Sequence, residues 1–230
     1  MDKNHQLPQY IAEFIGTFFL VFLGCGAVIL SELDSTAINN FAIPLVFGGT
    51  VSIMIYSVGH ISGAHFNPAV TIAFWAIKRL PGVRVPGYLF AQFLGALIAS
   101  ISHYLIWGKL GHSFGQTILS TGLGAGLFIE FIISFGLMFV ITSVATDSRA
   151  AGELAGIAIG TTVAVSAFFA GPLTGASMNP ARSFAPALMS ANFENIWVYL
   201  LTPVLGASLG AFVYDRTRCI KESQSSSGCC

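Results

Sequence analysis

Two stretches of this chain repeat each other and decide its fold: residues 59–69 read GHISGAHFNPA, and residues 171–181, 112 positions later, read GPLTGASMNPA. Each ends in Asn-Pro-Ala: Asn67, Pro68 and Ala69 in the first copy, and Asn179, Pro180 and Ala181 in the second. Asn is a favoured N-cap of helices, and Pro is a favoured first helical residue.

A short apolar stretch follows each copy, at residues 68–77 and 180–189. At 1.5 Å per residue such a stretch is about 15 Å long, which is half of a bilayer. The pair therefore predicts two half-helices, each preceded by irregular backbone. At membrane depth such backbone is tolerated only where it is buried in protein or lines an aqueous cavity.

The composition agrees with a membrane location. Of 230 residues, 54% are hydrophobic and 9% are charged, the mean hydropathy is +0.77 and the net charge is zero. A soluble domain carries roughly 25% charged residues, and nucleic-acid binding needs a basic patch, so a soluble enzyme and a nucleic-acid binder are both excluded. Six apolar runs have the length of a membrane span: residues 10–30, 41–58, 85–107, 123–146, 154–170 and 196–214. The fold class predicted is an all-α membrane protein with six transmembrane helices and two re-entrant half-helices.

The repeat divides the chain into a first half at residues 1–115, a second half at residues 116–215 and a tail at residues 216–230, which together form one domain. Three spans per half is an odd number, so the halves must have opposite orientations in the membrane, as an inverted repeat. The two Asn-Pro-Ala loops then enter from opposite faces and can meet near the midplane.

Lysine and arginine in the loops predict the orientation of the chain. With the N-terminus in the cytoplasm, most cations fall on the cytoplasmic side and the C-terminus is cytoplasmic too. The cytoplasmic cations are Lys3, Lys78, Arg79, Arg84, Arg149, Arg216, Arg218 and Lys221, against Lys109 and Arg182 on the other side. The expected location is the plasma membrane or a bacterial inner membrane. The tail reads as a plain polar segment, with acylation of Cys229 and Cys230 as an alternative.

These motifs resemble the aquaporin, or major intrinsic protein, family over essentially the whole chain. The similarity is carried by SGAHFNPAVT at residues 62–71 and SMNPARSF at residues 177–184, and the stretch at residues 171–178 most resembles the nodulin-26-like branch. The resemblance implies a membrane channel without enzymatic activity, assembled in the bilayer as a homotetramer with one pore per subunit.

Two half-helix N-termini that meet head to head place their positive dipole ends at one point. If each Asn oxygen caps its helix, the NH₂ groups of Asn67 and Asn179 are left free to donate to a neutral molecule. A cation would meet a positive potential there and lose its hydration shell. Arg182 could be an interfacial anchor, but a position in the pore is preferred because the half-helix faces inward. The resemblance places Arg182 in a narrow outer selectivity filter with Phe47, Ala167 and Ala176.

This filter differs from that of strict water channels, which have His on the fifth span. Because Ala167 and Ala176 are small and apolar, we expect a wider filter that passes glycerol, urea, or metalloid hydroxides such as boric and arsenous acid, together with water. A strict water channel is the main alternative. A proton-coupled carrier and a scaffolding protein with an occluded pore are further alternatives, since inverted repeats also occur in carriers.

Glu13 and Glu130 occupy the same place in the two halves. Intramembrane carboxylates suggest proton relay, but these two are better explained as acceptors for the backbone N–H groups of the two loops. His65 is expected to line the cytoplasmic vestibule. No His, Cys or carboxylate pattern has metal-ligand spacing, so no cofactor or metal is predicted.

Overall fold

The computed structural model describes residues 6–110, 113–147, 149–150 and 152–217, and within them the chain is entirely helical, without strands. Six helices are long and apolar enough to span a membrane, and α3 and α7 are short. The α-helices are α1 (Leu7–Leu33), α2 (Ala42–Ser62), α3 (Pro68–Ala76), α4 (Val85–Trp107), α5 (Leu123–Thr146), α6 (Ala155–Thr174), α7 (Pro180–Ser190) and α8 (Ile196–Thr217). The predicted fold class is confirmed.

The helix bounds follow the sequence prediction closely, with two informative differences. The helices α4 and α5 have the predicted bounds, but α2 and α6 continue beyond their predicted ends to Ser62 and Thr174. Each ends at a glycine with left-handed backbone, Gly63 at φ +88° and Gly175 at φ +80°. The prediction stopped too early because the first glycine of each repeat was taken as the break, whereas the second glycine supplies the αL conformation that ends a helix.

Close helix packing depends on glycines that face backbone carbonyls. A Cβ at Gly206 of α8 would lie 2.3 Å from the carbonyl oxygen of Phe131 on α5, and Gly210, one turn later, is equally tight. In the first half, a Cβ at Gly95 of α4 would lie 2.4 Å from the carbonyl oxygen of Phe14 on α1. The pairs α5–α8 and α1–α4 therefore approach at a distance that only glycine permits.

We expect Gly206→Ala to lower the free energy of unfolding by about 1–3 kcal/mol, because the new methyl group must push α8 away from α5. The matched control is Gly136→Ala on α5, where a Cβ meets nothing within 4 Å. Thermal unfolding of the detergent-solubilised variants measures the difference. Equal midpoints for the two variants would contradict the packing described here.

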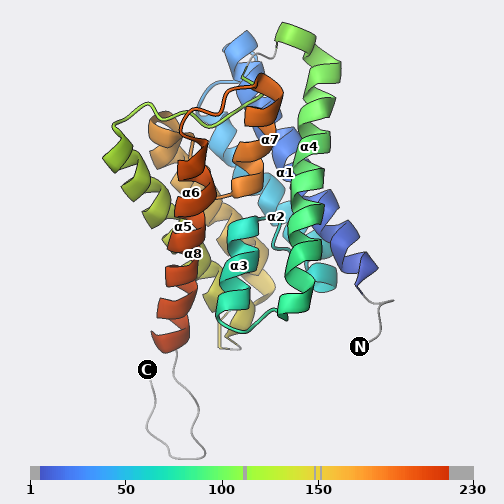
Figure 1. Ribbon diagram of the computed structural model, residues 1–230, viewed down its shortest axis with the longest axis vertical. Helices are drawn as coiled ribbons and strands as arrows, with labels where there is room; N and C mark the ends of the chain where they lie inside the picture. Colours follow the sequence, from blue (N-terminus) through green and yellow to red (C-terminus); the bar gives the residue numbers. More distant parts are fainter. Residues whose placement is uncertain (1–5, 111–112, 148, 151, 218–230) are drawn as a thin grey trace, which may run out of the picture.

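Figure 1 shows that α1 begins and α8 ends at the same end of the bundle, which we call the terminal end. The half-helix α3 lies in the half of the bundle near this end, and α7 lies in the other half. An ion pair of 3.7 Å between Arg79 and Asp215 joins the segment after α3 to α8 at the terminal end. Of the predicted tail, the structure describes only residues 216 and 217, so Cys229 and Cys230 lie outside the described residues.

The connection between α5 and α6 is also tied to α8 at the terminal end. The hydroxyl of Tyr214 donates to Asp147 Oδ2 at 3.1 Å, and the Arg149 guanidinium donates to both carboxylate oxygens of Asp147. The hydrogen bonds from Arg149 hold the pKa of the Asp147 carboxyl well below its usual range. Asp147 therefore stays ionised when the pH falls through the range in which an unperturbed aspartate is protonated.

Candidate functional site

The two half-helices begin with the capping arrangement that Asn-Pro predicts. Asn67 Oδ1 accepts a hydrogen bond of 2.8 Å from the backbone N–H of Ala69. Asn179 Oδ1 accepts bonds of 3.0 and 3.3 Å from the backbone N–H groups of Ala181 and Arg182. Both helix starts are thus fixed by an asparagine oxygen, which leaves the amide nitrogen of each side chain pointing away from its own helix.

Each amide nitrogen crosses to the loop of the opposite half. Asn67 Nδ2 donates to the carbonyl oxygen of Met178 at 2.7 Å, and Asn179 Nδ2 donates to the carbonyl oxygen of Phe66 at 2.9 Å. The N-termini of α3 and α7 therefore meet head to head. The expectation that both N–H groups of each amide are free was wrong, because the loop carbonyls need donors of their own. One N–H of each asparagine remains for another acceptor.

The carboxylate of Glu13 holds the first loop. Glu13 is fully buried and accepts hydrogen bonds from the backbone N–H groups of His65 (2.9 Å) and Phe66 (2.7 Å). It also accepts from the Ser62 hydroxyl at 2.7 Å and from Gln92 Nε2 at 2.7 Å. These contacts are the ones expected of a carboxylate that satisfies irregular backbone inside a membrane.

Glu130 occupies the matching place beside the second loop. It is fully buried and accepts from the backbone N–H groups of Ser177 (2.9 Å) and Met178 (3.0 Å) and from the Thr174 hydroxyl (2.7 Å). The loops themselves have residues with positive φ in both halves, Ala64 and Phe66 in the first and Ala176 and Met178 in the second. Their backbone cannot form a helical ladder, so each carboxylate substitutes for the missing acceptors.

Two tyrosines complete the frame around the loops. Tyr88 of α4 donates to the carbonyl oxygen of Ser62 at 2.7 Å, and Tyr199 of α8 donates to that of Thr174 at 2.8 Å. Each hydroxyl therefore satisfies the last helical carbonyl before a loop, where an α-helix has no partner of its own. The two tyrosine contacts occupy corresponding places in the two halves.

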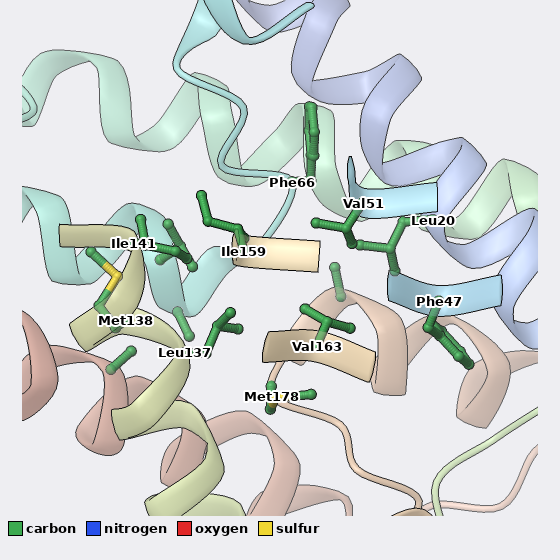
Figure 2. Close-up of a cluster of buried hydrophobic side chains, with 14 of the residues drawn as sticks. Leu20, Phe47, Val51, Phe66, Leu137, Met138, Ile141, Ile159, Val163 and Met178 are labelled. Atoms are coloured by element: carbon green, nitrogen blue, oxygen red, sulfur yellow. The ribbon is translucent and has the colours of Figure 1, made fainter. Parts of the chain in front are cut away.

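A cavity of about 610 Å³ extends from the terminal end of the bundle to the point where the N-termini of α3 and α7 meet. Figure 2 shows a cluster of buried apolar side chains that includes Val51 of α2, Leu137 of α5 and Ile159 of α6, and these three residues line the cavity. Asn67, Asn179 and the residues of the two loops line the same cavity. One wall is thus apolar, while another carries amide and backbone polar groups.

A second cavity of about 490 Å³ lies towards the opposite end, with Ser31, Glu32 and Gln116 in its wall. The two cavities share four lining residues: Phe47, Ala167, Ala176 and Arg182. The four residues that the family resemblance grouped together therefore lie at the boundary between the cavities.

Arg182 is held in a fixed place at this boundary. Its side chain is 3% exposed, its Nη1 donates to the carbonyl oxygen of Gly115 at 2.7 Å, and its guanidinium carbon lies 5.0 Å from the centre of the Phe47 ring. An interfacial anchor would be exposed at the membrane surface, so that alternative does not fit. The shared walls of the cavities combine a cation, an aromatic ring and two methyl groups.

His65 lies in the wall of the larger cavity, but its ring is also packed within the protein. Its Nδ1 is 3.0 Å from Thr71 Oγ1, and the ring stacks on Phe74 and lies 5.0 Å from the ring of Tyr88. The side chain therefore has one partner on the half-helix α3 and one edge left for the cavity.

Two contributors to the site were missed by sequence reasoning. Gln92 donates to Glu13 and, at 2.8 Å, to Thr71 Oγ1, and Gly115 supplies the carbonyl that binds Arg182. A buried amide in an apolar run was a usable signal for Gln92, because polar side chains in a span need a partner inside the protein. Gly115 acts through its backbone carbonyl, so its residue type gave no signal of that contact.

Comparison with known proteins agrees with this architecture. The family model of the major intrinsic proteins matches residues 1–214. The chain is 51% identical over 210 residues to "Putative aquaporin NIP4-1" of Arabidopsis thaliana, a match that covers 91% of this chain and 74% of the relative. It is 48% identical over 213 residues to Nodulin-26 of Glycine max, which covers 92% of this chain and 78% of that protein.

A solved structure shows the same fold. The X-ray structure of the aquaglyceroporin from Plasmodium falciparum superimposes with a TM-score of 0.83 at 28% identity, covering 92% of this chain and 96% of that one. With six apolar spans, two opposed half-helices and this similarity over nearly its whole length, the chain belongs to the major intrinsic protein family and is an integral membrane channel of the aquaporin type, not an enzyme.

Proposed function

We propose that this channel passively conducts water and small uncharged solutes, with glycerol, urea and metalloid hydroxides such as boric and arsenous acid as its solute class, and excludes protons and ions. The observation that carries the proposal is the boundary between the two cavities, where Ala167 and Ala176, whose side chains are single methyl groups, line both cavities together with Arg182. Small side chains leave room for a solute larger than water. The similarity to an aquaglyceroporin structure supports the same solute class.

In this proposal Arg182, Phe47, Ala167 and Ala176 form the selectivity filter. The guanidinium repels cations and donates hydrogen bonds to a hydroxyl or carbonyl of the solute, while the Phe47 ring and the methyl groups contact its carbon backbone. A cation that reached the filter would have to shed its water against an apolar wall, which is costly.

The two Asn-Pro-Ala motifs form the central constriction. The free N–H groups of Asn67 and Asn179 donate to the passing molecule, and the positive ends of α3 and α7 disfavour a proton or a cation at the same point. Pro68 and Pro180 start the half-helices, and Ala69 and Ala181 provide the backbone N–H groups that hold the asparagine oxygens. His65 contributes to the vestibule on the terminal side.

Glu13 and Glu130 have a structural role in this proposal. Their oxygens are engaged by loop N–H groups and hydroxyls, which argues against a carrier in which they bind and release protons during transport. We further propose that the terminal end faces the cytoplasm of a plasma membrane or bacterial inner membrane, and that four copies assemble with one pore in each.

We expect the purified protein in liposomes to raise permeability to glycerol and boric acid at least about tenfold over empty vesicles, with flux linear in the solute gradient, because a pore lowers the barrier without saturable turnover. Stopped-flow light scattering with water, glycerol, urea and boric acid on one preparation measures this. Water flux alone would identify a strict water channel. Flux that depends steeply on a proton gradient would identify a carrier, and no flux would identify an occluded pore.

A further inference from the structure

The segment before α5, at residues 113–120, belongs to none of the helices yet reaches the filter. Gly115, at φ +69°, presents its carbonyl oxygen to Arg182 Nη1 at 2.7 Å. On its other side a Cβ at Gly115 would lie 2.7 Å from the carbonyl oxygen of Cys25 on α1. The segment is thus wedged between α1 and the arginine, and the position of its backbone sets where the guanidinium lies.

Thr117 anchors this segment to the second half-helix. Its side chain is buried, and its Oγ1 donates to Ser183 Oγ at 2.9 Å. Ser183 is fully buried on α7 and directly follows Arg182 in the chain. The Cγ2 methyl of Thr117 also packs against Gly175, where a Cβ would be 3.0 Å away. The Thr117 side chain is also hydrogen-bonded to Tyr199 of α8. The threonine therefore combines polar contacts to Ser183 and Tyr199 with an apolar contact to Gly175, and substitution can separate the polar contacts from the apolar one.

The hydroxyl chain continues from Ser183 into the second loop. Ser183 Oγ and Ser177 Oγ are 2.5 Å apart, and Ser177 Oγ donates to the carbonyl oxygen of Asn179 at 3.0 Å. Since the Ser177 proton points to Asn179, the Ser183 proton is the one that joins the two serines, and Ser183 is left as acceptor for Thr117.

The first half contains the same pair but a different third member. His65 and Thr71 hold the places of Ser177 and Ser183, two residues before and four residues after the asparagine, and their side chains are 3.0 Å apart. There the third member is Gln92, which belongs to the helix α4. In the second half it is Thr117, which belongs to a connecting segment that itself holds the filter arginine.

We propose that Thr117 is a positioning residue for the selectivity filter. Its hydrogen bond to Ser183 fixes the Gly115 carbonyl, and this carbonyl holds the Arg182 guanidinium at the side of the boundary between the cavities, outside the path of the solute. This inference rests on the proposed function, which it deepens by naming a specificity-determining residue outside the filter. When the anchor is lost, the guanidinium is released from Gly115 and leans into the boundary between the cavities. Glycerol is then obstructed more than water, because it is larger.

Thr117→Val removes the hydroxyl and keeps the Cγ2 methyl. We expect this variant to lower the ratio of glycerol to water permeability by about fivefold, which is the factor that corresponds to the net worth of one hydrogen bond. Thr117→Ser retains the hydroxyl and should restore the ratio. Thr142→Val is the matched control, because Thr142 is a buried threonine whose hydroxyl bonds only to the Met138 carbonyl of its own helix among the described residues. The readout is stopped-flow permeability in proteoliposomes.

A purely structural role for Thr117 would lower the unfolding midpoint without moving the permeability ratio, and that result overturns the inference. So does a Thr117→Ser variant with the same ratio as Thr117→Val. If Thr117→Val does not fold, Ser183→Ala breaks the same bond from the other side and takes its place.

A structure of the variant by electron cryomicroscopy tests the inference without any flux measurement. We expect Arg182 Nη1 to have left the Gly115 carbonyl, and an unchanged arginine overturns the proposal. If the wild-type protein conducts no solute, the proposed function fails, while the position of Arg182 in the variant still decides the role of Thr117.

Discussion

The Glu13→Ala variant is expected to lose about 3–5 kcal/mol of unfolding free energy, which is the cost of removing one partner from a buried charged network. The substitution removes the shared acceptor of four donors: the Ser62 hydroxyl, the backbone N–H groups of His65 and Phe66, and Gln92 Nε2, of which Gln92 keeps its second hydrogen bond, to Thr71. The irregular backbone of the loop has no helical ladder that could receive them. Thermal unfolding in detergent should show a midpoint lower by roughly 6–20 °C.

Glu130→Ala and Glu32→Ala are the matched variants. Glu130 accepts three hydrogen bonds within the described residues, one fewer than Glu13, so its loss should cost about 1 kcal/mol less. Glu32 is exposed, and its replacement should change stability by no more than about 0.5 kcal/mol. If Glu13→Ala were as stable as the wild type while solute flux stopped, the structural role would be wrong and proton relay would be the better explanation.

The second large effect concerns the width of the filter. Ala167→His is expected to reduce glycerol permeability at least about tenfold, which corresponds to roughly 1.4 kcal/mol of barrier. Water permeability should change by less than about threefold. Ala167 lies in the wall of both cavities, as does Arg182, so an imidazole there occupies the space that the solute needs. The added ring nitrogens can still bond to water.

A histidine introduced outside the two cavities serves as the control. Trp197 is half-exposed at the start of α8 and lines neither of the two cavities, so Trp197→His should leave the ratio of glycerol to water permeability unchanged. Unchanged glycerol flux in Ala167→His, with the protein folded, would show that the narrowest point lies elsewhere.

The parts of this fold that sequence predicted are those with a local chemical cause. The starts of α3 and α7 were predicted to the residue, because the asparagine cap and the proline act within one helical turn. The matching of Glu13 with the first loop and of Glu130 with the second followed from counting acceptors against backbone donors. The burial of Arg182 followed from its place just inside a half-helix that the repeat turns towards the interior.

The parts that were missed depend on contacts between distant segments. Gly115 and Arg182 are 67 positions apart in the sequence, and Thr117 and Ser183 are 66 positions apart. No periodic pattern in the sequence indicates either contact. The hydrogen bond that the side-chain amide of Asn67 donates to the second loop was missed for a similar reason. The capping function of the side chain was readable, but the acceptor for its nitrogen exists only once the other half is in place.

The hydrogen bonds between the two loops have a consequence for the synthesis of the chain. The ribosome synthesises Asn67 well before Met178. The side-chain amide of Asn67 therefore lacks its acceptor in the folded protein while more than a hundred residues are added. Phe66 likewise lacks the donor that arrives with Asn179. The contacts that join the two loops can therefore form only after residues 178 and 179 have been synthesised.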